Sequence, residues 1–121
     1  MADLRMPDLN RIIIAGNLVK DPRFDETSNG IPVSNFTVAS NRRFTDRFGE
    51  TKEDVCFIEV VAWRGLAESC AENLSQGSAV LVTGELQSRQ RKTGDGGFRN
   101  MVEVRARHVQ FLNKQQNYSP A

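Results

Sequence analysis

The chain has 121 residues, with 16 Lys and Arg against 15 Asp and Glu, which leaves a formal net charge of +1. That length supports one domain with its own core and argues against a multidomain enzyme. The near-neutral balance excludes a protein that binds polyanions by bulk charge alone. No apolar run approaches the roughly 20 residues needed to cross a bilayer, and residues 1–8 lack the pattern of a secretory signal.

Sulfur and imidazole groups are scarce. The sequence has two cysteines, Cys56 and Cys70, and one histidine, His108. These are too few for a disulfide scaffold or a four-ligand zinc site, so we expect no metal and no cofactor. A reducing, cytoplasmic setting fits this cysteine usage best.

The first part of the chain shows two strand patterns separated by turns. A β-branched run from Ile12 to Ile14 places the first strand within residues 10–19. The dipeptide Asp21-Pro22 then favours a turn. The second strand covers residues 33–41, where Phe36 and Val38 alternate with polar neighbours, as in a half-buried strand.

The third predicted strand, residues 55–64, has two unlike faces. Its even positions are small or apolar, and we predict that they join the core: Cys56, Ile58, Val60 and Ala62. Its odd positions are Val55, Phe57, Glu59, Val61 and Trp63. Because the even positions already form a complete core face, we expect the rings of Phe57 and Trp63 to be exposed.

The pattern then changes to a helix and returns to strand. Apolar residues recur every four positions from Leu66 to Leu74, which predicts a short amphipathic helix capped by Gly65 and Gly77. Residues 80–87 and 98–112 alternate again and predict two more strands. In the last strand, Val102, Val104 and Ala106 are predicted to point inward, and Glu103, Arg105 and Arg107 outward.

Three strands, one short helix and two strands is the order of the OB-fold, a five-stranded Greek-key barrel. The predicted fold class is therefore all-β with one short helix. We expect this domain to span residues 9–112, after an N-terminal arm of residues 1–8. The polar residues 113–121 are expected to begin a linker.

Basic residues gather in two segments, expected to be the loop between strands two and three and the hairpin between strands four and five. Residues 42–52 hold four basic against two acidic residues, and residues 87–107 hold six against two. The candidate phosphate contacts among them are Arg42, Arg43, Arg89, Arg91, Lys92 and Arg99. A charged run alone is most often a solvated face, so aromatic neighbours decide its meaning.

Aromatic side chains are interleaved with these basic segments. Phe44 and Phe48 lie in the first and Phe98 in the second, while Phe36 and Phe111 are assigned to the core. We expect Phe44 and Phe48 both to be exposed, Phe44 more readily. Ring faces accept unstacked bases of any kind, and a duplex hides its base faces. The pattern predicts a binder of single strands without sequence preference.

Catalytic interpretations find little support. His108 lies in phase with the inward residues of the last strand, so a rim or core position is expected. Cys56 falls on the predicted core face and Cys70 on the apolar stripe of the helix, where thiols act as packing groups. The glycines of residues 94–97 do not open a helix, so a phosphate-binding loop lacks its helix terminus.

Several ordered motifs at matching spacing resemble the bacterial single-stranded DNA-binding proteins over residues 9–112. The matching segments are Asn10 to Leu18 with Asp21-Pro22, Asn35 to Ala39, Phe57 to Trp63 leading into Leu66 to Glu68, and Gly77-Ser78 before Val80 to Leu86. The resemblance implies base-stacking roles for Phe44, Phe57 and Trp63. The family's fourth-strand aromatic position is Arg91 here, whose guanidinium can stack on a base and pair with phosphate.

The resemblance also implies partners. Family members form homotetramers, so we expect a homo-oligomer of four subunits. They end in an acidic tip that recruits replication and repair proteins, whereas this sequence ends at Ala121 without one. Such partners are expected only if the natural chain carries that tip.

The expected function is non-catalytic, sequence-independent binding and protection of single-stranded DNA in replication, recombination and repair, with no membrane contact. An alternative is an OB-fold interaction module of replication restart with weak DNA binding, which the departure at Arg91 keeps open. A second alternative is a small thiol enzyme that uses Cys56 or Cys70 with His108.

Overall fold

A computed structural model describes residues 5–112 of the chain. Its elements are β1 (Ile12–Leu18), β2 (Arg23–Glu26), β3 (Pro32–Thr45), β4 (Thr51–Trp63), α1 (Arg64–Asn73), β5 (Ala79–Lys92) and β6 (Phe98–Phe111). The predicted linker of residues 113–121 and the first four residues of the predicted N-terminal arm lie outside the described residues. Between residues 5 and 112, no helix has the length and apolarity that a membrane span requires.

The strands form one sheet in the order β1-β5-β6-β4-β3-β2, and an added pairing of β1 with β3 closes it. Within the described residues, β1, β5, β6, β4 and β3 thus make a five-stranded barrel, and α1 is its one helix, as predicted. The β4–β6 pairing is parallel, and the other pairings are antiparallel. The four-residue β2 pairs only with β3 and was not predicted, because its exposed residues show no alternation.

The barrel is filled by alternating side chains from its strands. The fully buried valines of the core cluster are Val38, Val60, Val80, Val82 and Val104, and Phe36 joins them with 4% of its surface exposed. Phe111 packs against this cluster from its edge, as expected. Helix α1 contributes Ala67 and Cys70, and the buried hydroxyl of Ser34 donates a hydrogen bond of 2.7 Å to the Ala67 carbonyl. That bond satisfies a polar group under the helix.

Helix α1 begins earlier than the periodicity predicts. Its N-cap is Trp63, which makes no side-chain capping bond, and Gly65 lies inside the first turn. The first helical residue, Arg64, has a φ of 59°, a left-handed conformation that favours glycine. The sequence pattern did not reveal this start, because neither residue is a typical capping residue.

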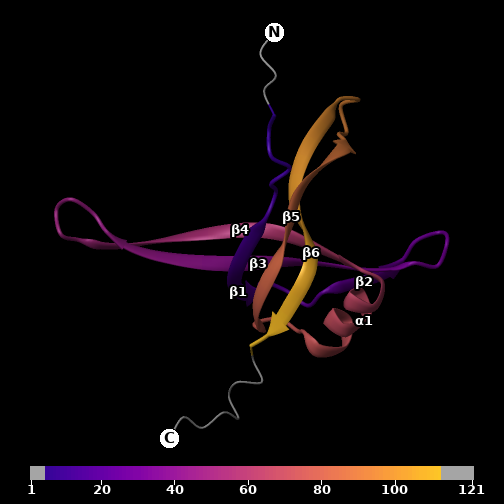
Figure 1. The fold of residues 1–121 in the computed structure, drawn as a ribbon, viewed down its shortest axis with the longest axis horizontal. Coiled ribbons are helices and arrows are strands. Elements are labelled where there is room, and N and C mark those ends of the chain that lie inside the picture. Colours follow the sequence, from indigo (N-terminus) through magenta and orange to yellow (C-terminus); the bar gives the residue numbers. More distant parts are fainter. Residues whose placement is uncertain (1–4, 113–121) are drawn as a thin grey trace, which may run out of the picture.

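Two hairpins extend past the barrel as arms, as Figure 1 shows for β3–β4 and β5–β6. The β3–β4 pairing runs from Val33 opposite Trp63 out to Thr45 opposite Thr51. The turn beyond it is held by the Asp46 carboxylate, which accepts bonds of 2.9 Å from the backbone N–H groups of Phe48 and Glu50. The segment predicted as a loop is therefore mostly strand.

The arms explain why some core predictions were wrong. Cys56 is exposed, and Val102 is 53% exposed, because both lie where a strand has left the barrel and no second layer covers it. Conversely, Val61 is 1% exposed and Glu103 is 5% exposed, although both fall on the predicted outer face. Val61 lies in mid-sheet between Asn35 and Arg105.

A β-bulge in β6 reverses the phase of the last strand. Thr83 pairs with His108 and Gly84 pairs with Ala106, so Arg107 is an extra residue on β6. After the bulge, His108 is exposed, contrary to the predicted inward phase, and Val109 packs against the core. A period-two pattern cannot show such an insertion.

Candidate nucleic-acid interface

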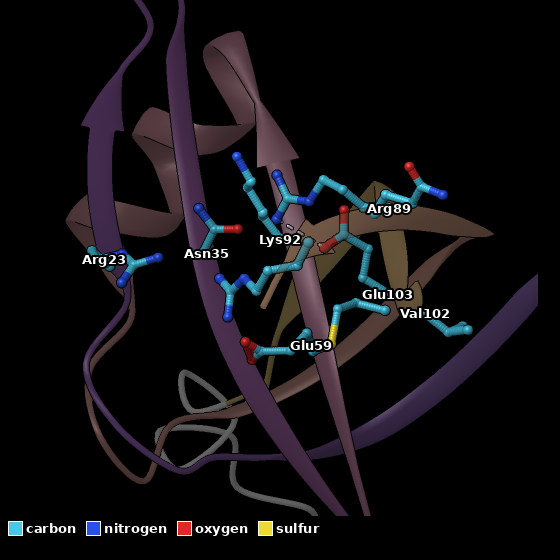
Figure 2. Close-up of a pocket in the computed structure, with 10 residues that line it drawn as sticks. Arg23, Asn35, Glu59, Arg89, Lys92, Val102 and Glu103 are labelled. Carbon is cyan, nitrogen blue, oxygen red and sulfur yellow. Dashed lines mark hydrogen bonds and ion pairs between the residues drawn. The ribbon is translucent and has the colours of Figure 1, made fainter. Parts of the chain in front are cut away.

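A groove of about 440 Å³ crosses the outer face of the sheet, between the β5–β6 arm and β2. Its lining residues are Arg23, Asn35, Glu59, Arg89, Gln90, Arg91, Lys92, Met101, Val102 and Glu103. Figure 2 shows Arg23 and Asn35 toward one side and Arg89 and Glu103 toward the other. The groove therefore has basic side chains at both margins. Sequence reasoning missed Arg23 and Asn35, because nothing indicated that β2 folds against β3.

A row of four polar side chains crosses the sheet at the groove. Thr37 pairs with Glu59, Glu59 with Glu103, and Glu103 with Gln87, which joins β3, β4, β6 and β5. We call Thr37, Glu59, Glu103 and Gln87 the polar row. A hydrogen bond joins the two neighbouring residues at each end of the row. Thr37 Oγ1 donates to Glu59, and Gln87 Nε2 donates to Glu103 Oε2 at 2.7 Å.

Within the polar row, Glu103 holds a basic side chain in place. Its Oε1 accepts from the Arg89 guanidinium at 3.2 Å while its Oε2 is bound to Gln87. A carboxylate that is only 5% exposed requires such partners. Arg89 is thus oriented along the groove, and part of its charge is already balanced.

The aromatic candidates do not all lie on one face. Phe57 and Trp63 occupy odd positions of β4, the same face as Glu59, and Phe57 is 64% exposed while Trp63 is partly buried. Phe44 pairs with Lys52, so alternation places it on the other face of the β3–β4 hairpin. The structure places Phe57 on the face that bears the groove, although not in its lining, and it places Phe44 on the other face.

The expected order of exposure in the β3–β4 arm was wrong. Phe48 is 79% exposed, whereas Phe44 is only partly exposed. The Arg42 guanidinium lies 4.7 Å from the centre of the Phe44 ring and covers it by a cation–π contact. Phe48 lies in the turn, where only Arg47 approaches its ring, at 5.3 Å.

The candidate phosphate-binding residues differ in whether they form ion pairs. In the β3–β4 arm, Arg42 pairs with Asp54 at 3.1 Å, and Arg43 lies 4.0 Å from Glu53. In the β5–β6 arm, Arg91, Lys92 and Arg99 form no ion pair with any residue between 5 and 112. Arg91 and Arg99 are direct cross-strand partners, and like charges so placed repel each other. An anion between them would relieve that repulsion.

Comparison with known proteins shows to which family this chain belongs. A match to the Single-strand binding protein family covers residues 9–112. The chain belongs to this family. Membership assigns it a binding role rather than a catalytic one.

Curated relatives of the family align over most of the chain. Single-stranded DNA-binding protein 2 of Chlorobaculum tepidum is 59% identical over 110 residues, which cover 90% of this chain and 74% of that protein. The Caldanaerobacter subterraneus protein is 42% identical over 91% of this chain and 72% of its own length. Single-stranded DNA-binding protein A of Bacillus subtilis is 44% identical over 86% of this chain and 59% of its own.

A solved structure supports the fold. The chain is similar to a Plasmodium falciparum SSB solved in complex with ssDNA, with a TM-score of 0.80 at 24% identity. The alignment covers 90% of this chain and 99% of that one. The predicted OB-fold is confirmed by this likeness.

The two thiols of this family member should react very differently. Cys56 is exposed on β4, whereas Cys70 is fully buried, and burial raises the pKa of its thiol to about 11. Because the thiolate is the reactive form, a thiol reagent should label Cys56 quickly and Cys70 only on unfolding. Mass spectrometry of the native chain should show one fast adduct, and the Cys56→Ser variant should show none. Fast labelling of that variant would contradict the buried position of Cys70.

Proposed function

We propose that this chain binds and protects single-stranded DNA without a strict sequence requirement, in replication, recombination and repair in the cytoplasm. The observation that carries the proposal is the exposed ring of Phe57 on the face that also bears the groove and its unpaired basic residues. Relatives named as single-stranded DNA-binding proteins support it. So does the family likeness of the Plasmodium falciparum protein, whose structure contains ssDNA.

Two kinds of contact would share the binding. Unstacked bases would lie on the rings of Phe57 and Trp63, with Phe44 serving a strand that passes around the β3–β4 arm. Phosphates would follow the basic side chains, foremost the unpaired Arg91, Lys92 and Arg99, then Arg89, Arg42 and Arg43. Stacking serves any base and phosphate contact reads no sequence, so the combination is sequence-tolerant.

We also propose a homo-oligomer of four subunits. An apolar surface at one end of the barrel supports association: Met6 is 84%, Leu9 is 81% and Ile13 is 62% exposed. Nearby, Asn10 fixes the N-terminal segment to β5 by two hydrogen bonds of 2.8 Å with the Leu86 backbone. Light scattering after size exclusion gives the mass directly, and a monomer at micromolar concentration would contradict this assembly.

Titration of the full chain with equal lengths of poly-dT, duplex DNA and RNA tests the central proposal. Trp63 is the single tryptophan, so its fluorescence reports on β4 directly. We expect tight binding and quenching with poly-dT and only weak, salt-sensitive binding to duplex. Binding should weaken with salt, with a log–log slope of about −0.7 per phosphate contacted. Equal affinity for paired and unpaired DNA would overturn the proposal. Weak binding to every polymer would favour a protein-interaction module.

The two arms should contribute unequally to phosphate binding. Arg91 has no carboxylate partner within residues 5–112, whereas Arg42 would have to leave Asp54 or share its charge. We therefore expect Arg91→Ala to reduce the affinity more than Arg42→Ala, and to lower the salt slope by about 0.7. Salt titrations of both variants with poly-dT provide the measurement. Equal losses would show that the ion pair of Arg42 with Asp54 does not reduce the contribution of Arg42 to binding.

A further inference from the structure

A hydrogen-bond acceptor lines the groove near the place where a bound base would present its hydrogen-bonding edge. Phe57 and Glu59 are two positions apart on the same face of β4, which separates their Cα atoms by about 7 Å. A base stacked on the Phe57 ring therefore has its hydrogen-bonding edge within reach of the Glu59 side chain. Glu59 is exposed and lines the groove (Figure 2).

Glu59 differs from its acidic neighbour in having a free oxygen. Both oxygens of Glu103 are engaged, one by Gln87 and the other by Arg89. In Glu59, Oε2 accepts from Thr37, while Oε1 accepts no hydrogen bond from residues 5–112. The Thr37 contact limits the motion of the carboxylate, so Oε1 is a positioned acceptor on a side chain that lines the groove.

A positioned carboxylate discriminates between bases by their donors. Cytosine presents an N4 amino group, from which a carboxylate accepts a hydrogen bond well, whereas thymine and uracil present the O4 carbonyl at the same place on the ring. Two negative oxygens there repel each other. The N3–H donor of thymine and uracil lies between two carbonyl oxygens that repel a carboxylate. The carboxylate also repels phosphate, which keeps the strand's backbone at the basic margins and its bases toward the polar row.

We propose that Glu59 gives this groove a preference for bases with an exocyclic amino group, cytosine first, over thymine and uracil. This inference rests on the proposed single-strand binding and adds a base preference to it. The preference is modest because the stacking and phosphate contacts remain available to every base.

Oligomers of deoxycytidine and deoxyuridine make the sharpest comparison, because their bases differ only at ring positions 3 and 4. In mildly alkaline solution, where cytosine is unprotonated, wild-type protein should bind oligo-dC about five-fold or more tightly than oligo-dU. In Glu59→Gln the ratio should fall close to one, since an amide can both donate and accept. The control Glu68→Gln removes an exposed charge on helix α1 and should keep the wild-type ratio.

The ratio of the affinities for oligo-dC and oligo-dU distinguishes a specific contact of Glu59 with the base from a general electrostatic effect. If Glu59 acted only through its negative charge, loss of that charge would strengthen binding of both oligomers by the same factor and leave their ratio unchanged. An unchanged ratio in Glu59→Gln, or a wild-type ratio of one, would overturn the base preference while single-strand binding stands. Failure of wild-type protein to bind either oligomer would instead contradict the proposed function.

Discussion

Replacing Phe57 by alanine should reduce the affinity for single-stranded DNA about 5- to 150-fold, which corresponds to a loss of roughly 1–3 kcal/mol for one stacked base. Phe57 is 64% exposed on a regular strand, so its ring contributes little to the core and its removal should leave the fold intact. Titration with poly-dT at fixed salt gives the change. The salt slope should stay as in the wild type, because stacking releases no counterion.

A matched control is available in the same protein. Phe24 on β2 is 43% exposed, but alternation places it on the face opposite to Arg23 and the groove, beside a pocket that the acidic Asp25 and Glu26 also line. Phe24→Ala removes an exposed ring of the same size and should bind as the wild type does. If Phe57→Ala and Phe24→Ala lose equal affinity, the loss reflects general surface change and the stacking role of Phe57 is wrong.

The stacking contribution of Trp63 should be smaller than that of Phe57, because the Trp63 ring is less exposed. Its side chain is partly buried and its backbone is the N-cap of α1. Part of any change in Trp63→Ala would thus come from packing at the start of the helix. Phe57 is the cleaner measure of base stacking.

The barrel was predictable because its strands keep one face in the core along much of their length. Phe36 and Val38 on β3, and Val60 and Ala62 on β4, are buried as period-two alternation predicts. The same rule failed at Cys56 and Val102, which occupy hairpin arms with no second layer. Alternation identifies which side chains share a face, but it does not show where the barrel ends along a strand.

The binding roles of the candidate site residues stay a prediction, but the structure shows which of their contacts the sequence could not reveal. Clustered arginines and rings pointed to β4 and the β5–β6 hairpin, but the sequence could not show that Arg42 and Arg43 face Asp54 and Glu53 across a hairpin. That pairing depends on the register of two strands. The burial of Glu103 likewise depends on Gln87 and Arg89, which are distant in sequence.

Gly84→Ala should strongly destabilise the fold. Gly84 lies on β5 at the register shift opposite Ala106, and a Cβ atom there would fall 2.1 Å from the Arg105 carbonyl oxygen and 2.9 Å from its carbonyl carbon. Both obstacles are backbone atoms, so they cannot turn away as a side chain could. The two strands would have to separate at the bulge, at a cost of about 1–3 kcal/mol or more for an overpacked site.

Gly65→Ala is the matched control, since a Cβ atom at that helical glycine meets nothing within 4 Å. Alanine is favoured over glycine inside a helix by about 1 kcal/mol, so this variant should be as stable as the wild type or slightly more so. Urea unfolding of all three proteins should be compared at one protein concentration, because assembly makes the apparent stability depend on concentration. Gly84→Ala should unfold at a clearly lower urea concentration or fail to fold, whereas a wild-type midpoint would mean that β5 and β6 can separate at the bulge without loss of core packing.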